Sequence, residues 1–263
     1  SRDDLMPLLV QKMMLILIIV LTLSACNQVR SSSQKIRVSQ TTNKITSANL
    51  DLGIEYMKQG AYENALKNLE KAKKADPDYA STYNVLGLLY QKLGNNKKSE
   101  ENFKHALNLN KHDSSTLNNY SNFLCLQNRI EEAEKTFLKA AANPLYDSPE
   151  IAITNAGLCL SNNQRISDAE KYFRQALQLN PRVPQALIKM CKISFDQQKV
   201  LTARDYLQRY HKVASYTPKS LWLGIQIEQK LGDKDTVSSY VLQLKNNYPE
   251  SQEAKLLDIS RIQ

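Results

Sequence analysis

The chain has 263 residues, of which 42% are hydrophobic and 23% charged, and its formal net charge is +9 at pH 7. This length is enough for one extended domain or two compact ones. Lysine and arginine are scattered among aspartate and glutamate without a run of five like charges, which indicates solvated helix faces rather than a nucleic-acid-binding block. A moderately basic protein can still contact anionic surfaces such as lipid headgroups.

The first predicted element is an export signal over residues 1–25. An apolar run over residues 15–23 follows Lys12, and two small residues separate this run from Cys26. The run is too short to span a bilayer, which needs about 20 apolar residues, but it suits the apolar core of a secretory signal. The sequence Leu-Ser-Ala-Cys at its end resembles the lipobox of bacterial lipoproteins. An ordinary export signal with a chance cysteine, or a short amphipathic helix, stays open as the alternative.

The lipobox resemblance implies the chemistry of Cys26. Its thiol would be diacylglycerated, the signal would be cut before it, and the new amino terminus would be acylated. A covalent lipid is therefore expected at Cys26, and no other cofactor is expected. Because Asn27 stands where an aspartate would favour retention at the inner membrane, the resemblance implies the outer membrane, with the protein facing the periplasm. Export also argues against nucleic acid as a partner.

Residues 26–45 are predicted to comprise the lipidated cysteine and a flexible tether. They hold few aliphatic side chains among many Ser, Thr, Gln, Asn and basic ones. Such a composition cannot bury enough surface to offset the entropy lost on ordering. The folded body, residues 46–263, would therefore work at a distance from the membrane that holds it.

The remainder of the chain is a repeat. Small residues recur at intervals of 33 to 36 residues, at Gly53, Gly87, Ser121, Gly157, Cys191 and Gly224. A large residue follows each small one, at Leu69, Phe103, Phe137, Phe173, Leu207 and Tyr240. In two antiparallel helices joined by a short turn, close approach needs a small residue with a large side chain beside it. The pattern predicts helical hairpins that bury their apolar faces by stacking on their neighbours.

The recurring set Leu-Gly-x-x-Tyr, Ala, Phe, Ala and Pro resembles the tetratricopeptide repeat. This resemblance implies an all-α fold, a right-handed superhelical solenoid of about six helical hairpins with a C-terminal capping helix. A helical bundle without superhelical stacking is the alternative. The third repeat carries two extra residues before Ile151. The expected repeats are residues 46–79, 80–113, 114–149, 150–183, 184–216 and 217–250, followed by a capping helix over residues 251–261.

Cysteine and histidine spacing argues against a metal site and against catalysis. Besides Cys26 the chain has Cys125, Cys159 and Cys191, with no Cys-x-x-Cys pair and no neighbouring histidine, which argues against zinc. Their odd number leaves at least one free thiol, and a disulfide between Cys159 and Cys191 is one pairing that an oxidising compartment would allow. The three histidines are isolated, and no phosphate-binding loop or nucleophile elbow occurs. We therefore expect a binding protein without a metal, and not an enzyme.

Stacked hairpins present a concave surface lined by the first helix of each repeat, and we predict that this surface is the partner-binding groove. Asparagine is costly within a helix relative to alanine, so its recurrence there needs a reason. These amides either bond the main chain of an extended peptide or satisfy each other, and both interpretations stay open. The predicted groove residues are Asn84, Leu88, Gln91, Asn118, Asn122, Thr154, Leu158, Ile188, Lys192 and Phe195.

A lipobox, a polar tether and six such repeats together resemble the pilotin lipoproteins of type IV pilus systems. The most specific parts are AANPLYDSPEIAITNAGLCL over residues 141–160 and LWLGIQIEQKLGD over residues 221–233. The resemblance implies a protein that binds secretin subunits and promotes their outer-membrane targeting and multimerisation for type IV pilus biogenesis. A repeat lipoprotein accessory to outer-membrane barrel assembly or to peptidoglycan synthesis is the alternative.

Overall fold

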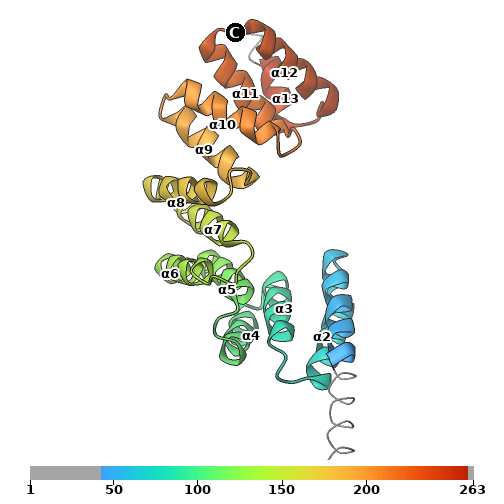
Figure 1. The fold of residues 1–263 in the computed structure, drawn as a ribbon. Helices are drawn as coiled ribbons and strands as arrows, with labels where there is room; N and C mark the ends of the chain where they lie inside the picture. The colour runs from blue at the N-terminus through green and yellow to red at the C-terminus, as the bar shows by residue number, and fades with distance from the viewer. Residues whose placement is uncertain (1–42, 260–263) are drawn as a thin grey trace, which may run out of the picture. The chain divides into compact units, whose positions relative to one another are not determined.

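The computed structural model describes residues 43–259, and this part of the chain consists of helices without a strand (Figure 1). Cys26, the predicted export signal and most of the predicted tether lie outside the described residues. Successive helices pair as hairpins, as the repeat pattern predicts. The pairs are residues 43–58 with α2 (Tyr62–Ala75), α3 (Ala80–Lys92) with α4 (Asn96–Leu109), α5 (Ser114–Leu126) with α6 (Ile130–Ala141), α7 (Pro149–Asn162) with α8 (Ile166–Leu179), α9 (Pro184–Asp196) with α10 (Val200–His211), and α11 (Pro218–Leu231) with α12 (Lys234–Asn247).

Within residues 43–259 the chain divides into two compact units, with the boundary between Leu109 and Asn110. In the first unit, the helix over residues 43–58 forms a hairpin with α2, and α2 packs against α3 of the next hairpin. The core of this unit includes Leu50, Leu69 and Leu86. In the second unit, α6 packs on α7, α8 on α9 and α10 on α11, so each hairpin covers the apolar face of the next.

In the first, second, fourth and sixth hairpins, a glycine on the first helix lies against a large side chain on the second. A Cβ atom added to Gly87 would lie 2.8 Å from the ring of Phe103, and one added to Gly157 would lie 2.7 Å from the ring of Phe173. Both rings are fully buried. The first and sixth hairpins repeat this contact between a glycine and a large side chain. The predicted pairing of small and large residues is therefore confirmed at these hairpins.

The turns between paired helices share a residue in the left-handed backbone region. Glycine fills this position in the first, second and sixth hairpins, where it carries no steric cost. Asparagine or glutamine fills it in the other three, where the side chain makes the same conformation less favourable. The residues, with φ between 60° and 78°, are Gly60, Gly94, Asn128, Gln164, Gln198 and Gly232.

A final short helix covers the last hairpin. This helix, α13 (Gln252–Ile259), lies within the range predicted for the capping helix. It buries Ala254 and Leu257 in a cluster with Leu221, Ile225 and Leu244 of α11 and α12. The predicted capping helix is therefore confirmed. It covers the apolar side of the last hairpin, which would otherwise face water.

Candidate partner-binding surface

The predicted groove residues all lie on the first helices of their hairpins. In the first unit, Asn84 is buried on α3, whereas Leu88 and Gln91 are half-buried. In the second unit, Thr154 is buried and donates a hydrogen bond of 2.7 Å to the main-chain oxygen of Glu150. A partner can reach the other side chains of this unit, of which Asn118, Asn122, Leu158, Ile188 and Phe195 are half-buried and Lys192 is exposed. Their role in binding stays a prediction.

The asparagines of α5 and α7 bond to one another. Asn155 Nδ2 donates to Asn118 Oδ1 at 3.0 Å, which joins the first helices of two neighbouring hairpins. Asn122 Nδ2 donates to the main-chain oxygen of Asn118 at 3.1 Å. The side-chain amides of Asn118 and Asn155 therefore satisfy each other, whereas that of Asn122 bonds to the main chain of its own helix. The half-buried pair of Asn118 and Asn155 also fixes the spacing of α5 and α7 on the predicted binding face.

The fifth hairpin gives this face a mixed aromatic and cationic character. The ammonium of Lys230 on α11 lies 5.0 Å from the ring centroid of Phe195 on α9, within the range of a cation–π contact. The same ammonium donates to Gln198 Oε1 at 2.7 Å. Lys192, one helical turn before Asp196, forms an ion pair with it. Apolar, aromatic and charged groups are therefore available together along α9.

A disulfide between Cys125 and Cys159 joins α5 to α7, with the Cα atoms 5.9 Å apart. The pairing considered from the sequence, between Cys159 and Cys191, is therefore wrong. Cys191 is a buried free thiol, and burial raises its pKa to about 12. In the repeat pattern it occupies the position that glycine fills at Gly87 and Gly157.

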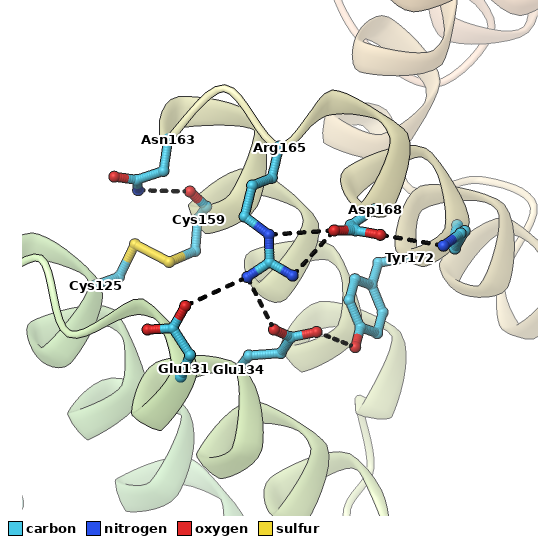
Figure 2. A network of polar contacts seen from close by, with 9 residues as sticks. Cys125, Glu131, Glu134, Cys159, Asn163, Arg165, Asp168 and Tyr172 are labelled. Atoms are coloured by element: carbon cyan, nitrogen blue, oxygen red, sulfur yellow. Dashed lines mark hydrogen bonds and ion pairs between the residues drawn. A yellow bond between two sulfur atoms is a disulfide. The ribbon is translucent and has the colours of Figure 1, made fainter.

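A second connection between the third and fourth hairpins involves their second helices. Figure 2 shows Arg165, in the turn between α7 and α8, pointing towards Glu131 and Glu134 of α6. Its Nη1 atom lies 3.7 Å from Glu131 and 3.4 Å from Glu134, and its Nη2 atom lies 2.9 Å from Asp168. Tyr172 of α8 donates a 2.7 Å hydrogen bond to Glu134. The disulfide and this network therefore hold the same two hairpins together at both layers of helices.

The network also changes the acidity of its members. Burial and the hydrogen bond to Glu134 raise the pKa of Tyr172 to about 12, so its hydroxyl remains protonated and able to donate. Hydrogen bonds from Lys171 and Arg165 lower the pKa of Asp168. The carboxylate of Asp168 is thus held in its charged form, as an ion pair requires. These are features of a connection between repeats, and no substrate-binding geometry accompanies them.

The segment that carries the two extra residues of the third repeat forms one wall of a hollow of about 670 Å³. The hollow is lined by residues within two segments, 110–115 at the start of α5 and 143–148 before α7. We call it the junction hollow. The length of this junction was visible in the sequence, but its hollow was not, because the segment carries no periodic pattern that would fix its path.

Neither a metal centre nor a membrane-spanning helix is found in the part of the chain that the structure describes. Within residues 43–259 no three His, Cys, Asp or Glu side chains are grouped so that they could hold a metal ion. None of the described helices combines the length and the apolar character needed to cross a bilayer.

Sequence families and the fold agree on the class of this protein. The family described as TPR repeat matches residues 53–94, and the family described as Tetratricopeptide repeat matches residues 80–113 and 152–183. With the contact between a glycine and a large side chain in four of the hairpins and the packing of neighbouring hairpins, these matches define a tetratricopeptide-repeat protein.

Relatives of known role narrow this class. The chain is 30% identical over 240 residues to the type IV pilus assembly protein PilF of Pseudomonas aeruginosa, which covers 91% of this chain and 94% of PilF. The solved structure of Pseudomonas aeruginosa PilF matches with a TM-score of 0.73 over 84% of this chain and 99% of that one. PilW, described as a widely conserved type IV pilus biogenesis factor, matches with a TM-score of 0.70 at 31% identity over 81% of this chain and 98% of its own. The chain belongs to the family of tetratricopeptide-repeat type IV pilus biogenesis proteins that includes PilF and PilW.

Proposed function

We propose that this protein is an outer-membrane lipoprotein that binds secretin subunits and promotes their outer-membrane targeting and multimerisation during type IV pilus biogenesis. The observation that carries the proposal is the similarity to PilF over almost the whole length of both chains. The fold supports a role in binding, because stacked hairpins offer an extended surface for a protein partner. In this proposal the protein acts without catalysis and without a cofactor other than its lipid. The pilus relatives favour this role over barrel assembly or peptidoglycan synthesis.

The proposed anchor is Cys26, which follows the residues Leu-Ser-Ala. Two acyl signals give stable attachment, whereas a single chain gives only marginal binding. Attachment restricts the repeats to a thin layer beneath the outer membrane and so raises the effective concentration of bound secretin there. The disulfide between Cys125 and Cys159 supports an oxidising compartment such as the periplasm.

The proposed secretin-binding face is formed by the first helices of the second unit. Leu158 and Phe195 are half-buried and can gain contact area from a partner, while the exposed ion pair of Lys192 and Asp196 offers polar contacts beside them. Helix α7, which carries Leu158, is held against α5 by the hydrogen bond between the side chains of Asn118 and Asn155 and by the disulfide between Cys125 and Cys159. A face that is ordered before binding loses less entropy when the partner arrives.

Replacement of Cys26 by alanine tests the anchor. The native protein is expected in the outer-membrane fraction and labelled by radioactive palmitate, and the Cys26→Ala variant is expected to lose both properties. The variant should keep the helical circular dichroism of the native repeats, because Cys26 lies before the first described helix. A variant that still fractionates with the outer membrane and still carries label would contradict the lipid anchor.

Paired substitutions on the binding face test the partner. Phe195→Ala and Leu158→Ala are expected to weaken binding of purified secretin subunits, and Leu201→Ala serves as the control because Leu201 is 70% exposed on α10, a second helix. Equal secretin binding by all three variants would remove this face from the proposal.

A further inference from the structure

Hydrogen bonds hold the two segments that line the junction hollow in place. Asn143 Nδ2 donates to the main-chain oxygen of His112 at 3.1 Å and to Ser114 Oγ at 3.0 Å, so it fastens the junction to the start of α5. Asn143 Oδ1 accepts from the main-chain N–H of Leu145 at 3.0 Å, and its main-chain oxygen accepts from that of Tyr146 at 3.0 Å. Both walls are therefore in place before any partner binds.

An apolar and an aromatic side chain stand next to each other in this fastened segment. Leu145 is 86% exposed although its backbone is held by hydrogen bonds. Tyr146, the next residue, is half-buried and lines the hollow beside it. Together they place a large apolar side chain at the rim of the hollow and an aromatic side chain in its wall.

The charge of the hollow is opposite to that of the whole protein. Its lining includes Asp113 and Asp147 but no lysine or arginine, whereas the formal net charge of the chain is +9. Asp113 is engaged at the start of α5, where it accepts from the main-chain N–H of Thr116 at 3.1 Å. Asp147 is exposed and forms no ion pair within residues 43–259. Burial, with smaller contributions from Glu150 and Asp113, raises the pKa of Tyr146, which is consistent with a negative field in the hollow.

We infer that the junction hollow binds an extended, basic segment of a protein partner, in which a lysine or arginine neighbours a large apolar side chain. The cation is placed between Asp147 and the ring of Tyr146, where ion-pair and cation–π attraction act together. The apolar neighbour packs on Leu145 and removes its exposed surface from water. The inference rests on the proposed function only in taking the partner to be a protein, since charge and apolar surface together fit a peptide.

Two fluorescein-labelled peptides provide the probe, Gly-Ser-Leu-Lys-Leu-Lys-Leu-Ser-Gly and the same peptide with glutamate in place of lysine. Fluorescence anisotropy is recorded with the full-length chain in detergent. We expect the lysine peptide to bind at least about tenfold more tightly than the glutamate peptide, with the difference shrinking at high salt. Equal affinity of the two peptides, or no binding of the lysine peptide, would overturn the inference.

Matched variants locate the binding. Asp147→Lys reverses a charge in the hollow, and Leu145→Ser removes the apolar contact. Each variant is expected to lower the affinity for the lysine peptide about fivefold or more. Asp51→Lys and Leu201→Ser make the same changes at exposed positions outside the hollow and are expected to leave the affinity within about twofold. Leu145 and Asp147 are exposed, so their variants should melt like the native protein. A loss of affinity in the control variants equal to that in the hollow variants would also overturn the inference.

The inference and the proposed function can fail separately. If secretin multimers depend on this protein but neither peptide binds, the hollow is not a docking site and the proposed function stands. If the lysine peptide binds at Asp147 and Leu145 but secretin multimers form without this protein, the hollow serves another protein partner and the secretin role is wrong.

Discussion

Cys125 and Cys159 are bonded across one repeat, 34 residues apart in the chain, and their bond ties the first helices of the third and fourth hairpins together. Arg165 ties the second helices of the same hairpins through Glu131 and Glu134. In a repeat protein each hairpin is stabilised mainly by its neighbours, so a covalent bond at one junction supports the repeats on both sides. Loss of a connection between the third and fourth hairpins should therefore lower the stability of the repeats on both sides of this junction.

Removal of the disulfide is expected to destabilise the second unit. Replacing Cys125 and Cys159 together by serine should lower the free energy of unfolding by about 2–4 kcal/mol, because the bond no longer restricts the unfolded chain. Urea unfolding followed by the fluorescence of Trp222 measures the effect, since this residue on α11 is the sole tryptophan in the sequence. A reducing agent should lower the midpoint of the native protein and leave that of the double variant unchanged. Equal midpoints of the native protein with and without reductant would contradict this.

The contact between Gly157 and Phe173 predicts a penalty for a single added methyl group. The Cβ of Gly157→Ala would lie 2.7 Å from the buried ring of Phe173, which cannot move without disturbing its neighbours. We expect a loss of about 1–3 kcal/mol from overpacking, although alanine is the better helix former. Thermal unfolding measures it, and the double variant with Phe173→Leu should recover part of the loss. A Gly157→Ala variant at least as stable as the native protein would show that the hairpins are not held this closely.

The left-handed turn residues predict a gain in stability. Gln198 has a φ of 61°, a conformation that costs a side-chain-bearing residue roughly 1–2 kcal/mol. Gln198→Gly relieves this strain, but it frees the unfolded chain and removes the exposed hydrogen bond from Lys230 to Gln198 Oε1, so a net gain of at most about 0.5 kcal/mol is expected. Gly94→Ala makes the reverse change at the equivalent turn, where φ is 72°, and should be destabilising. Urea unfolding measures the change in stability of both variants, and a loss of stability in Gln198→Gly would contradict this prediction.

His211 predicts how stability depends on pH. Its ring lies 4.0 Å from that of Tyr216 and 3.3 Å, through Nε2, from Ser220 Oγ, and burial lowers its pKa from 6.5 to about 4. The unfolded chain therefore binds the proton while the folded one does not between pH 6.5 and about 4. As the pH is lowered through this window, the free energy of unfolding should decrease, by at most about 1.4 kcal/mol per pH unit for one proton.

Substitution separates the contribution of this histidine from that of the other groups that bind protons in the same pH range. His211→Phe should flatten the dependence of the unfolding free energy between pH 6.5 and 4, whereas His112→Gln, at an exposed position, should keep the native slope. The difference in urea midpoint between native and variant protein, taken at each pH, isolates the contribution of His211. Identical slopes for the native protein and His211→Phe would show that the ring does not stay neutral on folding.

The hairpins could be predicted from the sequence because their determinants are local and repeated. Gly87 and Phe103 have the same separation along the sequence as Gly157 and Phe173, and both pairs are in contact. One packing rule therefore accounts for both pairs. The disulfide pairing was not predicted, because Cys125 and Cys191 both lie about one repeat from Cys159 and spacing alone cannot choose between them. The choice depends on which face of its helix each cysteine occupies.

The connections between repeats could not be predicted in the same way. Arg165 and Glu134 are 31 residues apart and meet only because a turn directs the arginine towards α6. The junction hollow depends on the path of residues 143–148, which Asn143 fixes through a hydrogen bond to His112. Neither contact recurs from repeat to repeat, so neither leaves a pattern that can be read along the chain.

The most direct test of the secretin role is the state of the secretin in cells that lack this protein. Detergent-resistant secretin multimers in outer-membrane fractions are measured after deletion of the gene, and after return of either the native protein or the Cys26→Ala form. Multimers are expected to be lost on deletion and to return to the outer membrane only with the native protein. Multimers that persist without the protein, or that the Cys26→Ala form restores in full, would contradict an anchored role in secretin assembly.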